Sequence, residues 1–362
     1  MKTNRKGNSA MSDTATGRPK ALIMISSARQ VPLAEPAGTS FSSGFFLSEM
    51  GPLLQDFRRD HDFVFATPDG RPPQLDVNGL FLAGYATPDE RAEVDAQAAA
   101  AQSAADFDAE ALRRDNPELV ARRDRELQTA YDLIGRITVS EILPGTEKEV
   151  ASIRDEVAET FQKLPAQEWL SAKDLIDRDR DPADSFDLGE FAFVHLPGGH
   201  APVVDFGDNP YLGELLNTLH DKGVVVSMIC HGPLALVSTK YRVTDDGKVT
   251  TGGDRPLAGA HVTTLAKQLE QSSADASKGG YLAYLAIPGK HTRLIEYVED
   301  RLREAEYQVD VPAVPTDPLA IYDEDRNLLT GDGPQAMAVQ TAQLRTILAQ
   351  TKAPKSANSP AP

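Results

Sequence analysis

Residues 226–235, with the sequence Val-Ser-Met-Ile-Cys-His-Gly-Pro-Leu-Ala, carry the strongest structural signal in this chain. The nearly continuous apolar run from Gly223 to Cys230 is typical of a buried strand, and Pro233 suits the first turn of a helix. A strand that leads into a cysteine and then a helix predicts a sharp elbow with an exposed side chain. In an open α/β sheet such an elbow lies at the carboxyl ends of the strands, where ligands bind.

Strands and helices alternate over the rest of the chain. Strands are predicted at residues 21–26, 63–68, 191–199 and 223–230, near 262 and 307, and in a hairpin at 320–330; helices are predicted at 44–57, 209–222, 233–239, 293–305 and 334–350. This alternation predicts an α/β fold with a mostly parallel sheet.

A stretch rich in Ala, Glu, Arg, Asp and Gln interrupts this pattern at about residues 87–187. Its apolar positions recur at helical spacing, so we expect a helical insertion that caps the site or mediates dimerisation. Residues 1–19 and 351–362 are polar and small, which predicts a disordered leader and tail. The expected α/β domain therefore spans residues 20–350, interrupted by the insertion.

The composition disfavours several classes of partner. The formal net charge is −17, which repels nucleic acids and anionic lipid headgroups. No segment approaches the roughly 18 apolar residues of a membrane span, and Met1 to Lys20 lacks the apolar region of a secretory signal. The single cysteine excludes an intrachain disulfide and fits a reducing compartment. We expect a soluble, cytoplasmic protein without nucleic-acid or membrane partners.

Cys230 is the candidate nucleophile, since the positive end of a following helix favours a thiolate. On its own it is equally compatible with a small buried hydrophobic residue at a strand end. His231 could carry or relay a proton. After the strand ending at Leu196, the amides of Gly198 and Gly199, with that of His231 or Gly232, could form an oxyanion hole.

Glu49 stands at the start of the helix that follows the first strand and loop. The ends of the first strands line the same crevice as the elbow, so a buried, protonated carboxyl there could donate to the sulfur and shuttle protons. The alternative is a solvated glutamate that the helix dipole favours.

These residues together resemble the ThiJ/PfpI superfamily, whose members have the glutamine-amidotransferase-like flavodoxin fold, a three-layer sandwich. The matching segments fall in the family's order: Gly44-Phe-Phe-Leu-Ser-Glu49, Phe63-Val-Phe-Ala-Thr-Pro68, Leu196-Pro-Gly-Gly-His200, Val226-Ser-Met-Ile-Cys-His-Gly-Pro233 and Leu328-Leu-Thr-Gly-Asp-Gly-Pro334. The Cys-His elbow, the Gly-Gly-His loop and the last of these segments look most like the chaperone and glyoxalase III subgroup, which carries an extra cap.

The resemblance implies glutathione-independent glyoxalase activity. Cys230 would attack the aldehyde of methylglyoxal to form a hemithioacetal, Glu49 and His231 would move protons through an enediol, and hydrolysis would release lactate. The implied substrate is a small dicarbonyl or aldehyde. Unfolded or glycated proteins are further implied partners, through holdase or deglycase activity. We expect a stress-related homodimer that uses no cofactor.

Family members often place an acid downstream of the histidine to orient it; Glu270 is our first choice here and Asp254 the second. Some members bind metal just after the equivalent of Glu49, but residues 55–65 offer only His61 beside acidic residues, so we expect no metal site. Two alternatives stay open: a holdase in which the elbow is vestigial, and a cysteine amidase or peptidase.

Overall fold

The computed structural model describes residues 17–87, 89–90, 93, 109–275, 288–314 and 317–352. Most of the expected leader and tail, and part of the expected insertion, lie outside these described residues.

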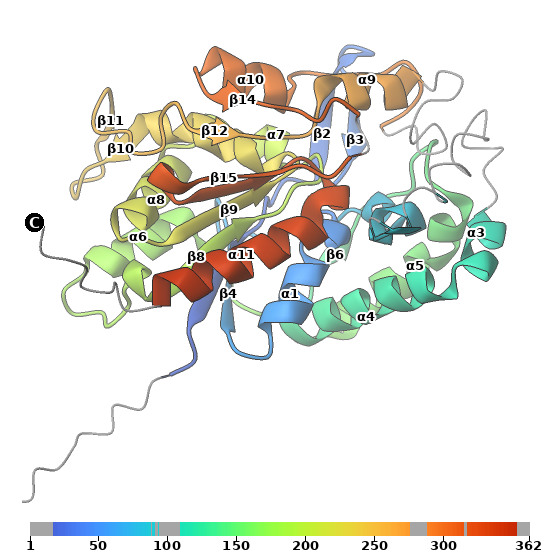
Figure 1. The fold of residues 1–362 in the computed structure, drawn as a ribbon, viewed down its shortest axis with the longest axis horizontal. Coiled ribbons are helices and arrows are strands. Elements are labelled where there is room, and N and C mark those ends of the chain that lie inside the picture. Colours follow the sequence, from blue (N-terminus) through green and yellow to red (C-terminus); the bar gives the residue numbers. More distant parts are fainter. Residues whose placement is uncertain are drawn as a thin grey trace, which may run out of the picture.

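A seven-stranded sheet runs through the middle of the molecule (Figure 1). Its strand order is β15-β16-β9-β8-β1-β4-β7, and all neighbouring pairs are parallel except β15 and β16. The strands are β1 (Lys20–Met24), β4 (Asp62–Thr67), β7 (Leu170–Ser171), β8 (Phe191–Leu196), β9 (Val225–Ile229), β15 (Ala320–Asp323) and β16 (Leu328–Gly331). The predicted α/β class with a mostly parallel sheet is confirmed.

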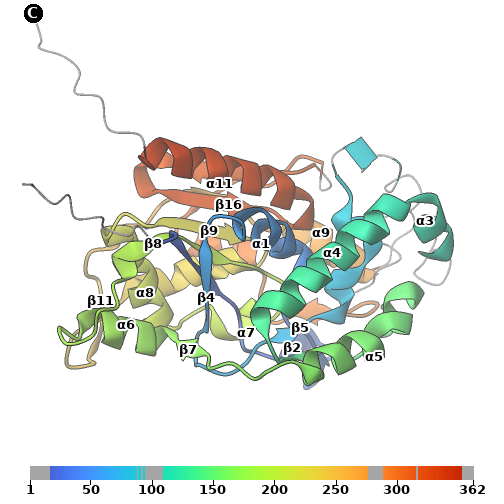
Figure 2. The same cartoon turned by 90° about the horizontal axis from the view of Figure 1, so that it is seen from below.

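Two hydrophobic cores lie on the two faces of this sheet. Ala21 and Ile23 enter one core and Leu22 and Met24 the other, because successive side chains of a strand point to opposite faces. The helices over the first core are α1 (Gly51–Phe57) and α11 (Met337–Lys352), and those over the second are α6 (Ala172–Arg180), α8 (Pro210–Asp221) and α10 (Val298–Glu304). Figure 2 shows α11 and α8 on opposite sides of the sheet, so the flavodoxin-like three-layer sandwich is confirmed.

Several smaller elements belong to none of the seven strands or five helices above. A three-stranded sheet contains β2 (Gln30–Glu35), β3 (Ser40–Ser42) and β13 (Arg293–Leu294). Two strand pairs are formed by β10 (Tyr241–Val243) with β11 (Val249–Thr251) and by β12 (His261–Val262) with β14 (Gln308–Val309). Two helices are α7 (Pro202–Asp205) and α9 (Lys267–Asp275). The prediction of a helix from Arg293 was wrong at its start. Leu294 is buried opposite Leu33 of β2, and α10 begins only at Val298.

Two further segments that we expected to be helical contain 3-10 helices. Residues 44–57 form a short 3-10 turn, η1 (Leu47–Glu49), before α1, whose first turn contains Pro52. After the elbow, η5 (Gly232–Lys240) is a 3-10 helix. The 3-10 helix is more tightly wound than the α-helix and is usual in pieces as short as η1, whereas the nine residues of η5 are a long run for this geometry.

The segment expected as an insertion contributes to two parts of the molecule. The helices α3 (Ala109–Asp115), α4 (Pro117–Ile134) and α5 (Lys148–Lys163) gather on one side (Figure 2), and β6 (Thr138–Val139) pairs with β5 (Gln74–Leu75). The segment's later elements, β7 and α6, are built into the sandwich, where β7 pairs with β4 and α6 packs on α8. Among the described helices, none has the length and apolar character needed to cross a membrane.

Candidate active site

The expected elbow is present at Cys230, but its side chain is buried rather than exposed, because neighbouring segments pack over it. This residue follows β9 directly and has a φ of 59°, in the left-handed region that non-glycine residues rarely occupy. Its amide donates to the carbonyl of Gly331 over 3.0 Å, and its carbonyl accepts from Oγ1 of Thr264 over 2.6 Å. Two separate segments therefore hold the backbone in a strained conformation, which is typical of functional positions.

A glycine loop after β8 packs against the elbow. A Cβ atom on Gly198 would lie 2.6 Å from Oε2 of Glu49, 2.7 Å from the amide nitrogen of His231 and 2.8 Å from Cβ of Cys230. Gly199 has a φ of 83°, which favours glycine. The absence of side chains in this loop therefore lets three predicted site residues meet around it.

Glu49 is a buried acid, as expected from the sequence. Its side chain is inaccessible to solvent, and its Oε2 accepts a hydrogen bond of 2.8 Å from the amide of Gly198. Burial raises the pKa of Glu49 to about 8, although interactions with the Cys230 thiol and the Gly198 amide oppose the rise. Glu49 is therefore mainly a neutral carboxylic acid at pH 7, and in this arrangement the Gly198 amide donates to it rather than to an oxyanion.

Cys230, His231 and Glu270 form a chain of contacts. The sulfur of Cys230 lies 3.3 Å from Nδ1 of His231, whose Nε2 lies 2.8 Å from Oε1 of Glu270. Burial opposes ionisation of Glu270, but His231 and His200 lower its pKa to about 2. Ionised Glu270 can then accept a hydrogen bond from an Nε2–H group of His231; with the single ring proton held there, Nδ1 is an acceptor that faces the thiol.

The charge state of the thiol differs from our expectation. Burial raises the pKa of Cys230 well above its ordinary value, and the carboxyls of Glu49 and Glu270 add to the rise. This shift of the Cys230 pKa disfavours the thiolate that we expected from a following α-helix. The element that follows is the 3-10 helix η5, and desolvation dominates.

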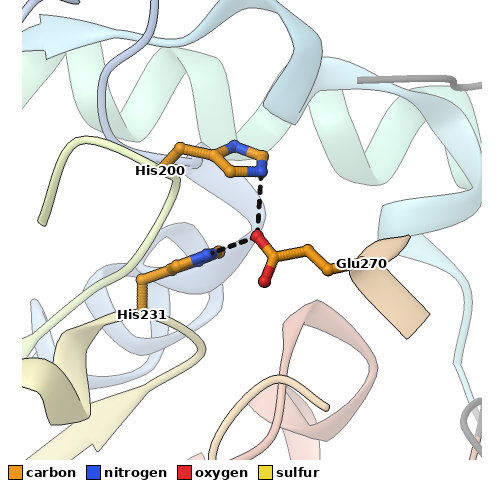
Figure 3. Close-up of side chains that lie close together, drawn as sticks. All are labelled: His200, His231 and Glu270. Carbon is orange, nitrogen blue, oxygen red and sulfur yellow. Dashed lines mark hydrogen bonds and ion pairs between the residues drawn. The ribbon is translucent and has the colours of Figure 1, made fainter. Parts of the chain in front are cut away.

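Figure 3 shows a residue that was not among the expected site residues. His200, at the end of the Gly-Gly-His loop, points its Nε2 at Oε1 of Glu270 over 3.4 Å, so that two imidazoles share one carboxylate. Its ring packs edge-on against Phe41 and Phe46. The Pro-Gly-Gly-His motif was a signal for this residue, but we assigned a function only to its glycines.

The remaining candidates lie as follows. Gly232 packs directly on the backbone carbonyl of Leu196, where no side chain would fit. Asp254, the second choice for the orienting acid, follows β11, and its carbonyl accepts a hydrogen bond from Arg242. His61 contacts Asp60 after α1.

Comparison with known proteins supports the resemblance drawn from the motifs. The fold and the elbow define an α/β protein with a cysteine at a strand end. Residues 173–268, which include the Gly-Gly-His loop and the elbow, match the model of the DJ-1/PfpI family. The resemblance to the ThiJ/PfpI superfamily is thus confirmed over residues 173–268.

Individual relatives are distant. The chain is 25% identical over 100 residues to the glutathione-independent glyoxalase hsp3101 of Schizosaccharomyces pombe, a match that covers 28% of this chain and 39% of the relative. It is 29% identical over 147 residues to the protein/nucleic acid deglycase HchA of Staphylococcus aureus, covering 41% and 42%. The matched segments thus span less than half of these relatives. The crystal structure of glyoxalase III from Candida albicans superposes with a TM-score of 0.46 at 15% identity, covering 91% of this chain and 96% of that one.

Proposed function

We propose that this protein is a glutathione-independent glyoxalase of the glyoxalase III type, which converts methylglyoxal and water to lactate at Cys230. One observation carries the proposal: a neutral acid, a thiol and a histidine–carboxylate pair converge around the glycine loop. The relatives named as glyoxalases support the choice of reaction, and those named as deglycases support glycated proteins as further substrates.

The first stage forms the hemithioacetal. His231 accepts the thiol proton at Nδ1, and the negative charge of Glu270 stabilises the resulting imidazolium. The sulfur attacks the aldehyde carbon, and Glu49 gives its proton to the oxygen that develops there. The amides of Gly199 and His231 are the candidates to stabilise that oxygen before it is protonated.

The second stage moves hydrogen between the two carbons. The Glu49 carboxylate removes the proton from the former aldehyde carbon while His231 protonates the ketone oxygen, which gives the enediol. Glu49 then returns its proton to the second carbon as His231 takes one from the first hydroxyl, and the product is a lactyl thioester. Water, deprotonated by Glu49, attacks this thioester, and the departing sulfur regains its proton from His231. Lactic acid is released and every group returns to its starting state.

A cysteine amidase or peptidase is the second candidate function. The 2.8 Å contact between His231 and Glu270 favours it, because an oriented histidine beside a thiol is what acyl transfer needs. The buried, protonated Glu49 has no evident task in that chemistry. Its position beside Cys230 and Gly198 is the reason that we place the glyoxalase first.

The experiment is a paired assay of the full-length protein. Lactate formation from methylglyoxal without glutathione, and burst release from activated esters and amides, are measured for the wild type and for Cys230→Ala. We expect lactate formation in the wild type and its loss in Cys230→Ala. Full methylglyoxal turnover in Cys230→Ala would reject the proposal, and a burst without lactate formation would favour the hydrolase.

A further inference from the structure

His200, His231 and Glu270 form a cluster whose geometry goes beyond the needs of the reaction. Their ligand atoms all lie within 4.8 Å of one another, and each side chain is buried (Figure 3). We propose that this cluster is a binding site for Zn²⁺ or a similar divalent transition-metal ion, which would switch the active site off. The ion would bind Nε2 of each histidine and Oε1 of Glu270.

The chemistry of the donors fits such an ion. Two imidazole nitrogens and one carboxylate oxygen are a common zinc ligand set, in which the fourth position is left to water or another small ligand. Donors at 2.0–2.1 Å from a tetrahedral zinc are about 3.3 Å apart. Oε1 of Glu270 lies 2.8 Å from Nε2 of His231 and 3.4 Å from Nε2 of His200, so small side-chain movements would admit the ion.

The orientation of the donor atoms also suits a metal. Oε1 of Glu270 already faces Nε2 of both histidines. Nδ1 of His200 has no hydrogen-bond partner within the described part of the chain, so a proton can stay there while Nε2 presents its lone pair. His200 and Glu270 are 7% and 9% exposed, whereas His231 is 1% exposed, so an ion would enter from the side of His200 and Glu270.

Binding of the metal ion would change the protonation of Nδ1 of His231, the nitrogen that faces Cys230. A neutral imidazole carries one proton, so when the metal occupies Nε2 that proton must lie on Nδ1. Nδ1, 3.3 Å from the sulfur, then donates and cannot accept the thiol proton. The inhibition rests on the proposed function, but the binding does not.

The test separates this site from zinc bound by the thiol. In a Cys230→Ser background of the full chain, Zn²⁺ affinity is measured by competition with a chromophoric chelator. We expect one ion per chain, and binding that is weaker by at least about tenfold in Cys230→Ser with His200→Gln. The matched control is His261→Gln, which alters a histidine that contacts Asp310 on the surface.

Equal binding in the His200→Gln and His261→Gln variants, or no stoichiometric binding, would overturn the proposal. Circular dichroism of each variant shows whether it is folded. If the wild type turns over methylglyoxal, added Zn²⁺ should inhibit it and a chelator should restore it. A protein that binds zinc through His200 but has no glyoxalase activity would retain the metal site and reject only the proposed function.

Discussion

The amide of Gly198 donates a 2.8 Å hydrogen bond to Oε2 of Glu49, and no side chain separates the two residues. This contact joins the loop after β8 to the turn before α1. It places the acid against the elbow, since the same glycine also borders Cys230 and His231.

Gly198→Ala should therefore damage the site more than the fold. The added methyl group would lie within 2.8 Å of three site residues, and such overpacking costs about 1–3 kcal/mol. We expect a fall in kcat/KM of about 100-fold or more, because displacement of catalytic groups by 1 Å has effects of that size. Gly253→Ala is the control, because among the described residues the new Cβ would have just Arg242 within 4 Å, at 3.5 Å. Equal kinetics in both variants would show that the close packing is unimportant.

The free energy of unfolding of Glu49→Gln, relative to that of the wild type, should increase as the pH rises. The folded-state pKa of Glu49 is about 8 against an ordinary 4.5, so the folded wild type holds a proton that the unfolded chain releases. The contribution of protonated Glu49 to the stability of the folded wild type is fully present below pH 4.5 and is lost as the pH rises to about 8. Urea unfolding of both proteins between pH 4.5 and 8 measures the difference. A constant difference across this range would contradict the raised pKa.

The same titration should appear in the kinetics. Since the proposed mechanism starts from protonated Glu49, kcat/KM of the wild type should fall above about pH 8. Glu49→Gln, which cannot shuttle a proton, should lose about 100-fold or more in activity. A pH profile that is flat through pH 9 would exclude Glu49 as the acid.

Glu270→Gln should impair turnover through His231. The amide cannot supply the charge that stabilises the imidazolium, and we expect kcat to fall by about 100-fold with a smaller change in KM. Asp254→Asn, at the acid that does not contact His231, should leave both constants close to those of the wild type. Equal loss in the two variants would point to a general effect of charge.

The buried ion pair between α4 and α5 should support the helices beside the sandwich. Arg123 and Glu149 are joined over 2.6 Å with side chains 2% and 1% exposed, so Arg123→Met leaves a carboxylate buried without that partner. Glu149 keeps an ion pair with Arg113 over 3.3 Å, so we expect a loss toward the lower end of about 3–5 kcal/mol in the free energy of unfolding, measured in urea. Asp155→Asn, at an exposed pair with Arg154, should cost less than about 1 kcal/mol. A comparable cost for both would contradict the role of burial.

The sheet and the elbow could be predicted because local patterns determine them. The apolar runs of β1 and β9 supply side chains to both cores, and Cys230 follows the second run directly. Leu294 could not be placed in the same way, because its partner Leu33 lies far away in the sequence. Burial in the small sheet outweighs the local helical pattern.

The candidate site was predicted in its parts but not in its arrangement. Glu270 was chosen as the orienting acid through a family resemblance, and it lies beside His231 in the structure. That His200 shares this carboxylate depends on three segments that meet only in the folded chain. The raised pKa of Cys230 follows from burial and from the nearby carboxyls of Glu49 and Glu270, which cannot be read from a linear sequence.

The φ of 59° at Cys230 implies that thermal stability and catalytic activity favour different residues at this position. A glycine would occupy this conformation at little steric cost, whereas a side chain there costs on the order of 1–3 kcal/mol. Laboratory selection for heat resistance alone should therefore tend to discard the thiol. Its retention under such selection would require a screen that also demands turnover.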